Sequence, residues 1–486
     1  MSRECGQGQH YQNLKGDQAM VNSGTAPTSM IFLLYGATGD LARRLVLPAF
    51  YRLAIAGLLP EDWRMIAEGR GEVTDEEFQE EVRKALEEFG PRPSEGPWEE
   101  VRRRLRFAGG GFRAHDPGTL LGVLAQAKKE MGGRPLLIHY MAVPPSAFGP
   151  FTEAIGAHGL AQGSRVVYEK PFGTSLESFR QLDKIAHETF DESQIYRIDH
   201  FLGKEATQNI HVLRFANGVF AGAWNSSHIE SVQIDVPETL DVAMRADFYD
   251  ATGAILDMLV THLFQIAGEI AMEPPHCLEP DCLGEAREAV IGCFRPLNAS
   301  DVVVGQYDGY RGTDDVPLDS RTETYVAARM WIDNERWAGV PFLLRTGKCL
   351  AESRQKVSVV FKDAVPGLPR QPHDGSILGF EMSGDGEIDL RLVIKQPGAQ
   401  MALGVGTTAL PLGSASGGPP LPAYSVLLND VLIGDRSLFT RPDGLEHVWT
   451  VADGILRNKP EPIPYARGTW GPREAVELAR PHAWVS

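Results

Sequence analysis

Apolar runs alternate with helix-like stretches over residues 29–199. The segment at 29–35 is almost continuously apolar, which is typical of a strand buried on both faces. It ends at a turn with two glycines, and apolar residues then recur at helical spacing over 41–56. Similar patterns predict further strands at 63–67, 135–143 and 164–168 and helices at 74–89 and 148–158. This alternation predicts an α/β, Rossmann-like dinucleotide-binding domain with a doubly wound parallel sheet.

The pattern changes after residue 200. Helical spacing covers 203–216 and 252–272, and apolar and polar residues then alternate over 322–330, 356–361 and 387–394. Such alternation is typical of strands in a sheet with one solvated face. A stretch rich in glycine, proline and serine at 410–424 is expected to be a surface loop. We therefore predict a flexible tail at 1–28, the Rossmann-like domain at 29–199, and an α+β domain with a large, mostly antiparallel sheet at 200–486.

The charge and hydropathy of the chain exclude some partners. The chain has 486 residues and a formal net charge of −17, whereas binding to a phosphate backbone needs a basic face. No run approaches the roughly eighteen apolar residues of a membrane span, and the first 28 residues lack the apolar segment of a signal peptide. We expect a cytoplasmic protein that binds neither nucleic acid nor membrane. An anionic substrate would need a few cations placed beside the catalytic groups.

Five cysteines are too few and too scattered for a disulfide framework. His276, Cys277, Cys282 and Cys293 lie close together in sequence, but their spacing matches no standard zinc pattern. We therefore expect reduced thiols and no metal site.

A turn with the sequence Gly-Ala-Thr-Gly-Asp-Leu-Ala at 36–42 links the first predicted strand to the first helix. Glycines let backbone amides approach a pyrophosphate, and a helix N-terminus favours its negative charge. A tight turn without a ligand is the alternative that this motif alone leaves open. The residues expected to contact a dinucleotide are Gly36, Thr38, Gly39, Asp40 and Leu41.

The end of the second predicted strand indicates which dinucleotide binds. An acidic residue there would bind the ribose 2′-hydroxyl of NAD, whereas an arginine would accommodate the 2′-phosphate of NADP. Arg70 lies at this point, with Arg43 and Arg44 on the first helix as helpers. Glu68 would repel a phosphate if its side chain faced the ribose. NADP is the expected cofactor, and use of NAD is left open.

Two segments carry the most specific signal: Tyr-Glu-Lys-Pro-Phe-Gly at 168–173 and Arg-Ile-Asp-His-Phe-Leu-Gly-Lys-Glu at 197–205. They resemble the Glu-Lys-Pro-Phe-Gly element and the active-site signature of the glucose-6-phosphate dehydrogenase family, which normally has tyrosine in place of Phe201. The turn at 36–42 fits the same family, as do segments 213–224, 339–348 and 430–454. The resemblance spans residues 30 to about 480. It implies a Rossmann-like domain followed by an α+β domain with a large sheet.

His200 and Lys204 flank the predicted start of a helix, with Gly203 between them. An imidazole and an ammonium beside free backbone amides suit the phosphate of a sugar phosphate. The alternative is a helix start with a surface lysine and a stacked histidine.

By resemblance, His262 is the catalytic base and Asp199 is the carboxylate that orients it. Removing the proton of the C1 hydroxyl while hydride leaves C1 requires a neutral imidazole with one free nitrogen. A carboxylate on the other nitrogen fixes that tautomer and stabilises the imidazolium that forms. Met258, Leu259 and Ile266 lie on the same helical face as His262, so a core histidine is the alternative.

The resemblance also implies roles for five more residues: Glu238 and Asp257 bind sugar hydroxyls, Lys348 binds substrate, Lys170 touches substrate and cofactor, and Tyr140 lies near the nicotinamide. The family tends to carry a second cation five residues after the lysine at 348. This chain has Ser353 there, and the adjacent Arg354 is a candidate replacement.

The implied reaction is oxidation of glucose 6-phosphate at C1 to 6-phosphogluconolactone by hydride transfer to NADP, the first step of the oxidative pentose phosphate pathway. One alternative is a paralogue that acts on another sugar or sugar phosphate, and a second is a catalytically idle regulatory subunit. Because family members associate through the large sheet, a homodimer or homotetramer is expected.

Overall fold

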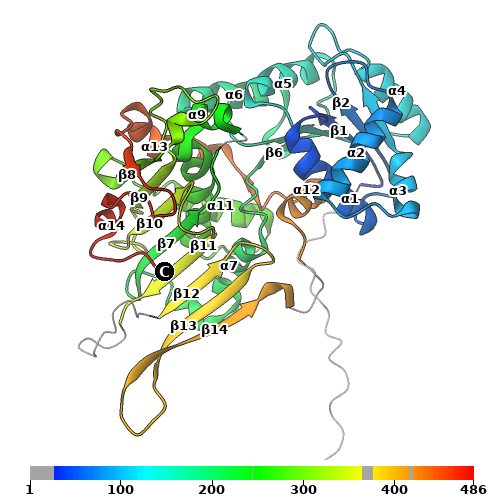
Figure 1. Ribbon diagram of the computed structural model, residues 1–486. Coiled ribbons are helices and arrows are strands. Elements are labelled where there is room, and N and C mark those ends of the chain that lie inside the picture. The colour runs from blue at the N-terminus through cyan, green and yellow to red at the C-terminus, as the bar shows by residue number, and fades with distance from the viewer. Residues whose placement is uncertain (1–26, 243–244, 278, 364–375, 415–419, 486) are drawn as a thin grey trace, which may run out of the picture.

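The computed structural model describes residues 27–242, 245–277, 279–363, 376–414 and 420–485. Figure 1 shows a Rossmann-like region, coloured blue to cyan, beside a second region built on a large sheet, coloured green to yellow. The predicted tail at 1–28 lies almost entirely outside the described residues.

The first sheet has seven strands in the order β15-β6-β5-β4-β1-β2-β3, and all neighbours are parallel except β15 and β6. The parallel order is that of a doubly wound dinucleotide-binding fold, and the predicted fold class is confirmed. The strands are β1 (Ser29–Tyr35), β2 (Asp62–Glu68), β3 (Leu105–Ala108), β4 (Leu136–Met141), β5 (Arg165–Tyr168), β6 (Ile195–Ile198) and β15 (Phe439–Thr440).

Alternate residues of β1 face opposite sides of this sheet, which explains why its sequence is apolar throughout. Met30, Phe32 and Leu34 pack in one hydrophobic cluster with α1 to α3 and with α12 (Ala423–Ile433), whereas Ile31 and Leu33 pack in another with α4 to α6. Burying each such side chain contributes about 1.5–3 kcal/mol. The helices are η1 (Ala42–Val46), α1 (Leu47–Ile55), α2 (Asp75–Phe89), α3 (Glu95–Arg102), α4 (Leu120–Met131), η2 (Pro145–Ala147), α5 (Phe148–Ala157), α6 (Leu176–Thr189) and η3 (Glu192–Gln194).

The second sheet has nine strands in the order β14-β13-β12-β11-β7-β10-β9-β8-β16. Only the pairs β7/β10 and β8/β16 are parallel, so the predicted mostly antiparallel sheet is confirmed. The strands are β7 (Ile229–Pro237), β8 (Val302–Tyr307), β9 (Tyr325–Met330), β10 (Phe342–Gly347), β11 (Lys356–Phe361), β12 (Ile377–Glu381), β13 (Glu387–Lys395), β14 (Leu403–Pro411) and β16 (Ile463–Tyr465).

Strand β9 of this sheet is covered on both faces, contrary to the expected solvated face. On β9, Val326 and Ala328 belong to the main hydrophobic core, while Tyr325 and Ala327 pack with residues of α14. The helices of this region are α7 (Glu205–Ala216), α8 (Gly218–Ala221), α9 (Ala246–Ala254), η5 (Ile255–Leu263), α10 (Phe264–Ala271), α11 (Pro280–Ile291), η6 (Ala299–Asp301), η7 (Tyr310–Gly312), η8 (Leu412–Ser414), α12 (Ala423–Ile433), α13 (Pro442–Arg457) and α14 (Glu474–Ala479).

The helical stretch Ala246–Ala271 is long and apolar enough to pass a length test for a membrane span, but 83% of its most apolar window is buried inside the fold. It therefore serves as a core helix. The chain departs from helical geometry at Gly253, whose φ is +69°, so α9 and η5 meet at a kink. Glycine suits this position because other residues rarely adopt a positive φ.

Two segments after residue 400 differ from the sequence expectations. Leu410 and Pro411 belong to β14 and α12 begins at Ala423, so the predicted loop at 410–424 is shorter than expected, and 415–419 lie outside the described residues. Helix α12 and strand β15 pack on the Rossmann-like sheet although both follow residue 200 in the chain. The boundary at 199/200 stays a prediction.

Candidate functional site

A buried histidine and a buried carboxylate meet between the two regions. Asp199 directly follows β6, and His262 lies near the end of η5, a π-helical stretch of a kind frequent at functional sites. Nδ1 of His262 lies 2.6 Å from Oδ1 of Asp199, and the two residues are 0% and 2% exposed. The same carboxylate oxygen accepts a hydrogen bond of 2.9 Å from the backbone N–H of Phe201, which orients it.

This pairing leaves Nε2 of His262 as the basic atom. An ionised carboxylate only accepts hydrogen bonds, so Nδ1 carries the proton. Nε2 has no hydrogen-bond partner among the described residues. Burial lowers the pKa of His262, with Asp199 opposing that shift. The imidazole is therefore neutral at neutral pH and able to accept a proton, as a general base must be.

Two aromatic rings pack against His262. The ring centroid of His200 lies 4.5 Å from that of His262, and the ring of Phe201 lies 4.7 Å away. Burial first, and then the ammonium groups of Lys170 and Lys204, hold the pKa of His200 well below its ordinary value. His200 is therefore a neutral imidazole, and its buried Nδ1 has no hydrogen-bond partner among the described residues.

Lys204 is the N-cap residue of α7, so the prediction that it lies at a helix start is confirmed. Its Nζ donates to the carbonyl of Met382 at 3.0 Å and lies 5.1 Å from the centroid of the Phe201 ring. Burial lowers the pKa of Lys204. The residue lines a pocket of about 350 Å³ together with Glu205, Met382, Gly386 and Pro422.

A second ion pair lies beside the dyad. Lys170 follows β5, and its Nζ donates to Oδ1 of Asp257 at 2.9 Å. Asp257 lies in η5, five residues before His262. Burial favours the neutral acid, but the charge and hydrogen bond of Lys170, with help from Lys348 and His262, hold the pKa of Asp257 below its ordinary value. Asp257 is therefore an ionised hydrogen-bond acceptor.

Lys348 and Glu238 are brought together by the sheet. Gly347 of β10 pairs in register with Pro237 of β7, and the two strands are parallel, so the next residue of each leaves the sheet at the same edge. Nζ of Lys348 donates to Oε2 of Glu238 at 2.6 Å. The structure thus brings both residues near the Lys170–Asp257 pair. These four residues lie far apart in the sequence, and each of them was predicted separately as a substrate-binding residue.

The candidate second cation is engaged elsewhere. Arg354 donates to Oδ2 of Asp235 at 2.5 Å and to the carbonyl of Val485 at 2.8 Å. Oγ of Ser353 accepts a hydrogen bond from the backbone N–H of Thr239. Because its guanidinium is held by β7 and the C-terminal segment, Arg354 does not replace a second cation beside Lys348.

The glycine turn has the shape that a dinucleotide needs. Gly36 has φ of +74°, and a Cβ there would lie 2.4 Å from the carbonyl oxygen of Ala142. Gly39 closes the turn by donating its N–H to the carbonyl of Gly36 at 3.0 Å. Thr38 and Asp40 are exposed and Leu41 is half-buried at the start of the first helix. A turn that excludes side chains and leads into a helix fits a pyrophosphate.

The residues at the end of β2 fit NADP. Arg70 is exposed just beyond the strand, next to the turn, because Tyr35 pairs with Glu68. Glu68 is only 3% exposed, and burial raises its pKa to about 7, with the N–H of Gly36 and the charge of Arg70 opposing that shift. Arg44 is paired with Asp40. A buried, partly protonated acid repels a 2′-phosphate little, while Arg70 is available to bind it.

Glu169 and Tyr424 belong to this region but were missed in the sequence. Oη of Tyr140 donates to Glu169 at 2.6 Å, and Oη of Tyr424 donates to its other oxygen at 3.3 Å. Burial raises the pKa of Glu169, which directly precedes Lys170. The Tyr424 ring also stacks on His200, with centroids 6.1 Å apart. No sequence signal links Tyr424 to the site, because α12 returns from the far end of the chain.

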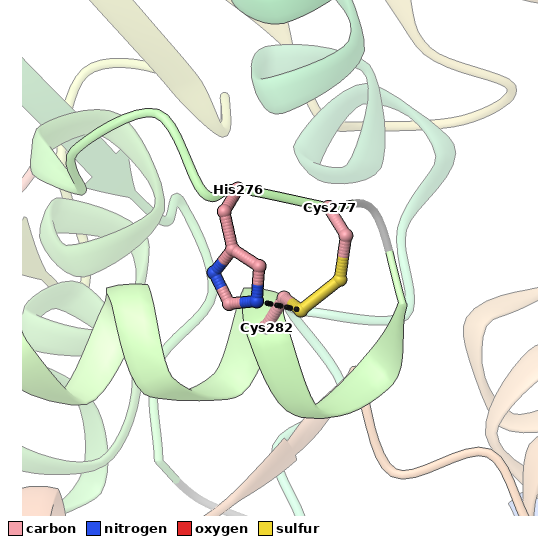
Figure 2. Close-up of side chains that lie close together, drawn as sticks. All are labelled: His276, Cys277 and Cys282. Atoms are coloured by element: carbon pink, nitrogen blue, oxygen red, sulfur yellow. Dashed lines mark hydrogen bonds between the residues drawn. A yellow bond between two sulfur atoms is a disulfide. The ribbon is translucent and has the colours of Figure 1, made fainter.

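The cysteines differ from expectation. Cys277 and Cys282 form a disulfide with Cα atoms 5.8 Å apart, so the prediction of reduced thiols is wrong for this pair. The start of α11 turns the chain back and brings Cys282 to Cys277, with Nε2 of His276 3.2 Å from Sγ of Cys282 (Figure 2). Cys293 and Cys349 are free thiols. The bonded sulfurs are not thiolates, which a zinc site would require.

Comparison with known proteins places these features in context. Residues 33–209 match the family described as glucose-6-phosphate dehydrogenase, NAD binding domain, and residues 211–485 match the one described as glucose-6-phosphate dehydrogenase, C-terminal domain. The cytoplasmic glucose-6-phosphate 1-dehydrogenase 6 of Arabidopsis thaliana is 34% identical over 465 residues, which cover 92% of this chain and 90% of that protein.

Two solved structures are similar over nearly the whole chain. The crystal structure of glucose-6-phosphate 1-dehydrogenase from Mycobacterium avium has a TM-score of 0.84 and 32% identity, covering 95% of this chain and 99% of that one. A glucose-6-phosphate dehydrogenase in complex with its substrate glucose-6-phosphate has a TM-score of 0.87 and 27% identity, with the same coverage.

Proposed function

This chain belongs to the glucose-6-phosphate dehydrogenase family, and we propose that it oxidises glucose 6-phosphate at C1 to 6-phosphogluconolactone, using NADP. The observation that supports this most strongly is the buried pair of His262 and Asp199, with Nε2 of the histidine left without a partner among the described residues.

His262 acts as the general base. Its Nε2 takes the proton of the C1 hydroxyl, and Asp199 stabilises the imidazolium that results. NADP, when bound, supplies the acceptor for the hydride that leaves C1. Such a positioned base typically contributes about 10²–10⁴-fold in rate. Burial of the dyad strengthens the attraction between the imidazolium and the carboxylate.

The substrate is held by groups on both sides of the dyad. Lys204 and His200 bind the phosphate at the start of α7, where backbone N–H groups favour an anion. Asp257 and Glu238 accept hydrogen bonds from the sugar hydroxyls, and their lysine partners at 170 and 348 hold both carboxylates in place. These local cations offset the net charge of −17, which would otherwise repel an anionic substrate.

The cofactor is held by the glycine turn and by the end of β2. Gly36, Thr38, Gly39, Asp40 and Leu41 would contact the pyrophosphate, and Arg70 would bind the 2′-phosphate. Tyr140, itself buried, would lie near the nicotinamide and fixes Glu169, which precedes the shared lysine at 170.

A closely related alternative is a preference for a different sugar phosphate. Phe201 has no hydroxyl to donate to the substrate phosphate, and Arg354 is held by Asp235. Loss of one such hydrogen bond costs about 0.5–1.5 kcal/mol. Initial rates with NADP⁺ and a set of hexose phosphates and free sugars distinguish the two. Highest kcat/KM with glucose 6-phosphate supports the proposal, and no activity with any sugar contradicts it.

We further propose a cytoplasmic homodimer or homotetramer that feeds the oxidative pentose phosphate pathway. The edge of the large sheet supports association, because β13 and β14 expose Leu392, Ile394, Val405 and Leu410 on a hairpin that projects from the body of the protein (Figure 1). The relative from Arabidopsis thaliana is named as cytoplasmic. Light scattering after size exclusion gives the oligomeric state, and a monomer would contradict this part of the proposal.

A further inference from the structure

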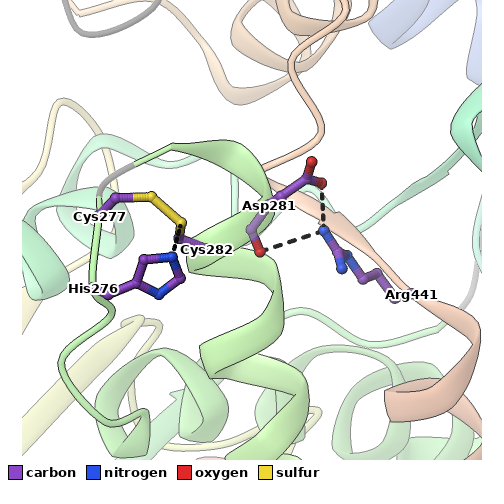
Figure 3. Close-up of a disulfide and its surroundings, with 5 residues drawn as sticks. All are labelled: His276, Cys277, Asp281, Cys282 and Arg441. Atoms are coloured by element: carbon purple, nitrogen blue, oxygen red, sulfur yellow. Dashed lines mark hydrogen bonds and ion pairs between the residues drawn. A yellow bond between two sulfur atoms is a disulfide. The ribbon is translucent and has the colours of Figure 1, made fainter.

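The Cys277–Cys282 disulfide has the surroundings of a reactive cysteine pair. Cys282 is the third residue of α11, where the partial positive charge of the helix N-terminus favours a thiolate. Nε2 of His276 lies 3.2 Å from its sulfur and provides a second stabilising group. Cys277 is half-buried on the preceding loop, whereas Cys282 is only 9% exposed (Figure 3). Cys277 is thus the more accessible sulfur for an attacking thiolate, and Cys282 is the better leaving group.

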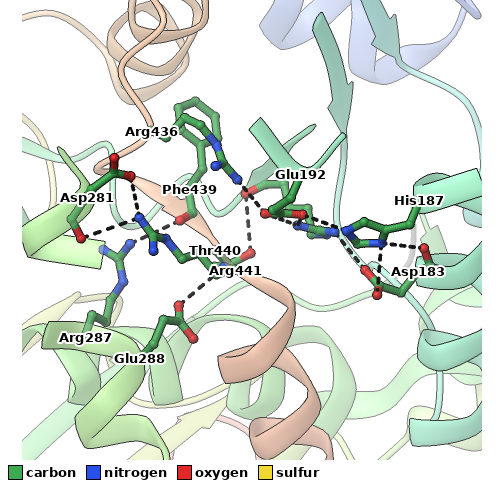
Figure 4. A network of polar contacts seen from close by, with 11 residues as sticks. Asp183, His187, Glu192, Asp281, Arg287, Glu288, Arg436, Phe439, Thr440 and Arg441 are labelled. Carbon is green, nitrogen blue, oxygen red and sulfur yellow. Dashed lines mark hydrogen bonds and ion pairs between the residues drawn. The ribbon is translucent and has the colours of Figure 1, made fainter. Parts of the chain in front are cut away.

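The residue beside Cys282 ties α11 to a distant segment. Oδ1 of Asp281 accepts a hydrogen bond of 2.7 Å from the guanidinium of Arg441, and its carbonyl accepts a longer one. The backbone N–H of Arg441 donates to Glu288, about two turns further along α11. Arg287 donates to the carbonyl of Phe439 at 3.1 Å. Helix α11 therefore makes hydrogen bonds to residues 439–441 at three points. Figure 4 shows the side chains involved.

Residues 439–440, which α11 contacts, form β15, an edge strand of the Rossmann-like sheet. In β15, Phe439 pairs with Ile198 and Thr440 with Arg197 of β6. Asp199 is the next residue after β6 and holds the catalytic imidazole. A continuous set of contacts thus runs from the disulfide through Arg441, β15 and β6 to the catalytic carboxylate.

We propose that Cys277 and Cys282 form a thiol–disulfide exchange site whose oxidised state supports turnover. An external thiolate attacks Sγ of Cys277, the sulfur–sulfur bond breaks, and Cys282 leaves as a thiolate. A second external thiol releases Cys277, so two thiols become one disulfide while the two cysteines gain two electrons and two protons. The external reagent is a small thiol or a protein dithiol.

The effect on turnover follows from the contacts of Asp281. In the oxidised protein the disulfide fixes the loop to the first turn of α11, and Asp281 keeps its place against Arg441. After reduction the covalent link between this turn and Cys277 is lost, so the turn frays more readily and the contact of Asp281 with Arg441 is weakened. The weaker contacts between α11 and β15 make β15, and with it β6, more mobile. This lowers the fraction of molecules in which Asp199 orients His262. This part rests on the proposed dehydrogenase activity.

The test compares the oxidised and the dithiothreitol-reduced full-length protein, with a chelator present so that freed thiols bind no trace metal. Reduction is expected to add two titratable thiols, assigned to Cys277 and Cys282 by alkylation and mass spectrometry. It is expected to lower kcat about two- to tenfold, with recovery on addition of oxidised glutathione. The double variant Cys277→Ser/Cys282→Ser should have the kcat of the reduced protein, and dithiothreitol should not change it. The kcat of Cys293→Ser should respond to dithiothreitol as that of the native protein does.

Hydrogen exchange separates this proposal from the proposed activity, since it needs no turnover. Faster amide exchange in 195–201 and 437–441 after reduction, and in Arg441→Ala without reduction, is expected. A pair that is never oxidised or never reduced in the folded protein would overturn the exchange site. Unchanged exchange in both segments, or equal kcat in the two redox states of an active enzyme, would overturn its coupling to Asp199.

Discussion

Nδ1 of His262 lies 2.6 Å from Oδ1 of Asp199, although 63 residues separate them in the chain. The aspartate is fixed by the end of β6 and by the N–H of Phe201, and the histidine by η5. Two parts of the fold that are distant in the sequence thus meet at this hydrogen bond, and the first prediction concerns its imidazole.

Replacing His262 with Asn should lower kcat at least about a hundredfold and change KM little, because the amide is a poor base but fills similar space. Steady-state kinetics with NADP⁺ and glucose 6-phosphate measure both constants. The matched control is His158→Asn, which alters an exposed histidine whose ring contacts Arg113 and Phe112 of the Rossmann-like region. An unchanged kcat in the His262 variant would remove it as the base.

Replacing Lys204 with Ala should chiefly raise KM for glucose 6-phosphate, because the ammonium at the start of α7 is assigned to the phosphate. Activity with unphosphorylated glucose should change much less. Lys184→Ala, an exposed lysine on α6, is the control. Proportional losses with the two sugars would show that Lys204 does not contact the phosphate.

Replacing Arg70 with Ala should reduce kcat/KM for NADP⁺ at least about tenfold while changing that for NAD⁺ much less, because only NADP carries the 2′-phosphate. The comparison uses both cofactors at saturating sugar phosphate. Arg92→Ala, an exposed arginine in the same region, provides the control. Equal losses with the two cofactors would contradict the assignment.

Glu68 should make stability depend on pH. Its pKa is raised to about 7 in the fold, above the ordinary value of 4.5, so the native state binds more protons than the unfolded state between these values. Stability from this group is therefore present at low pH and lost as pH rises from about 4.5 to 7, by up to about 3 kcal/mol. Glu68→Gln should raise the melting temperature at pH 8 and change it little at pH 4.5. A uniform shift at both pH values would argue against a buried titrating acid.

Local patterns in the sequence predicted the Rossmann-like region well. The strand at 29–35 was recognised because both of its faces are buried, and the turn after it because Gly36 must adopt a positive φ. Strand β15 has only two residues and pairs with a strand more than 200 positions earlier. No local pattern encodes such a partner, so this strand and α12 were not foreseen.

The site was predicted as separate residues, not as contacts. Resemblance supplied Asp199 and His262, but only the fold shows that they share a hydrogen bond. Tyr424 was missed because its partner, Glu169, lies 255 residues away. The disulfide was missed because a spacing of five residues permits a bond only if a helix turn brings the sulfurs together, as the start of α11 does.

The most direct test of the base assignment is a double-mutant cycle on kcat with Asp199→Asn, His262→Asn and the combined variant. If the two residues act as one unit, the aspartate has no function without its histidine. The combined variant is then predicted to be no slower than His262→Asn alone. If the two losses instead multiply, the residues act independently, and an Asp199-oriented His262 is not the base.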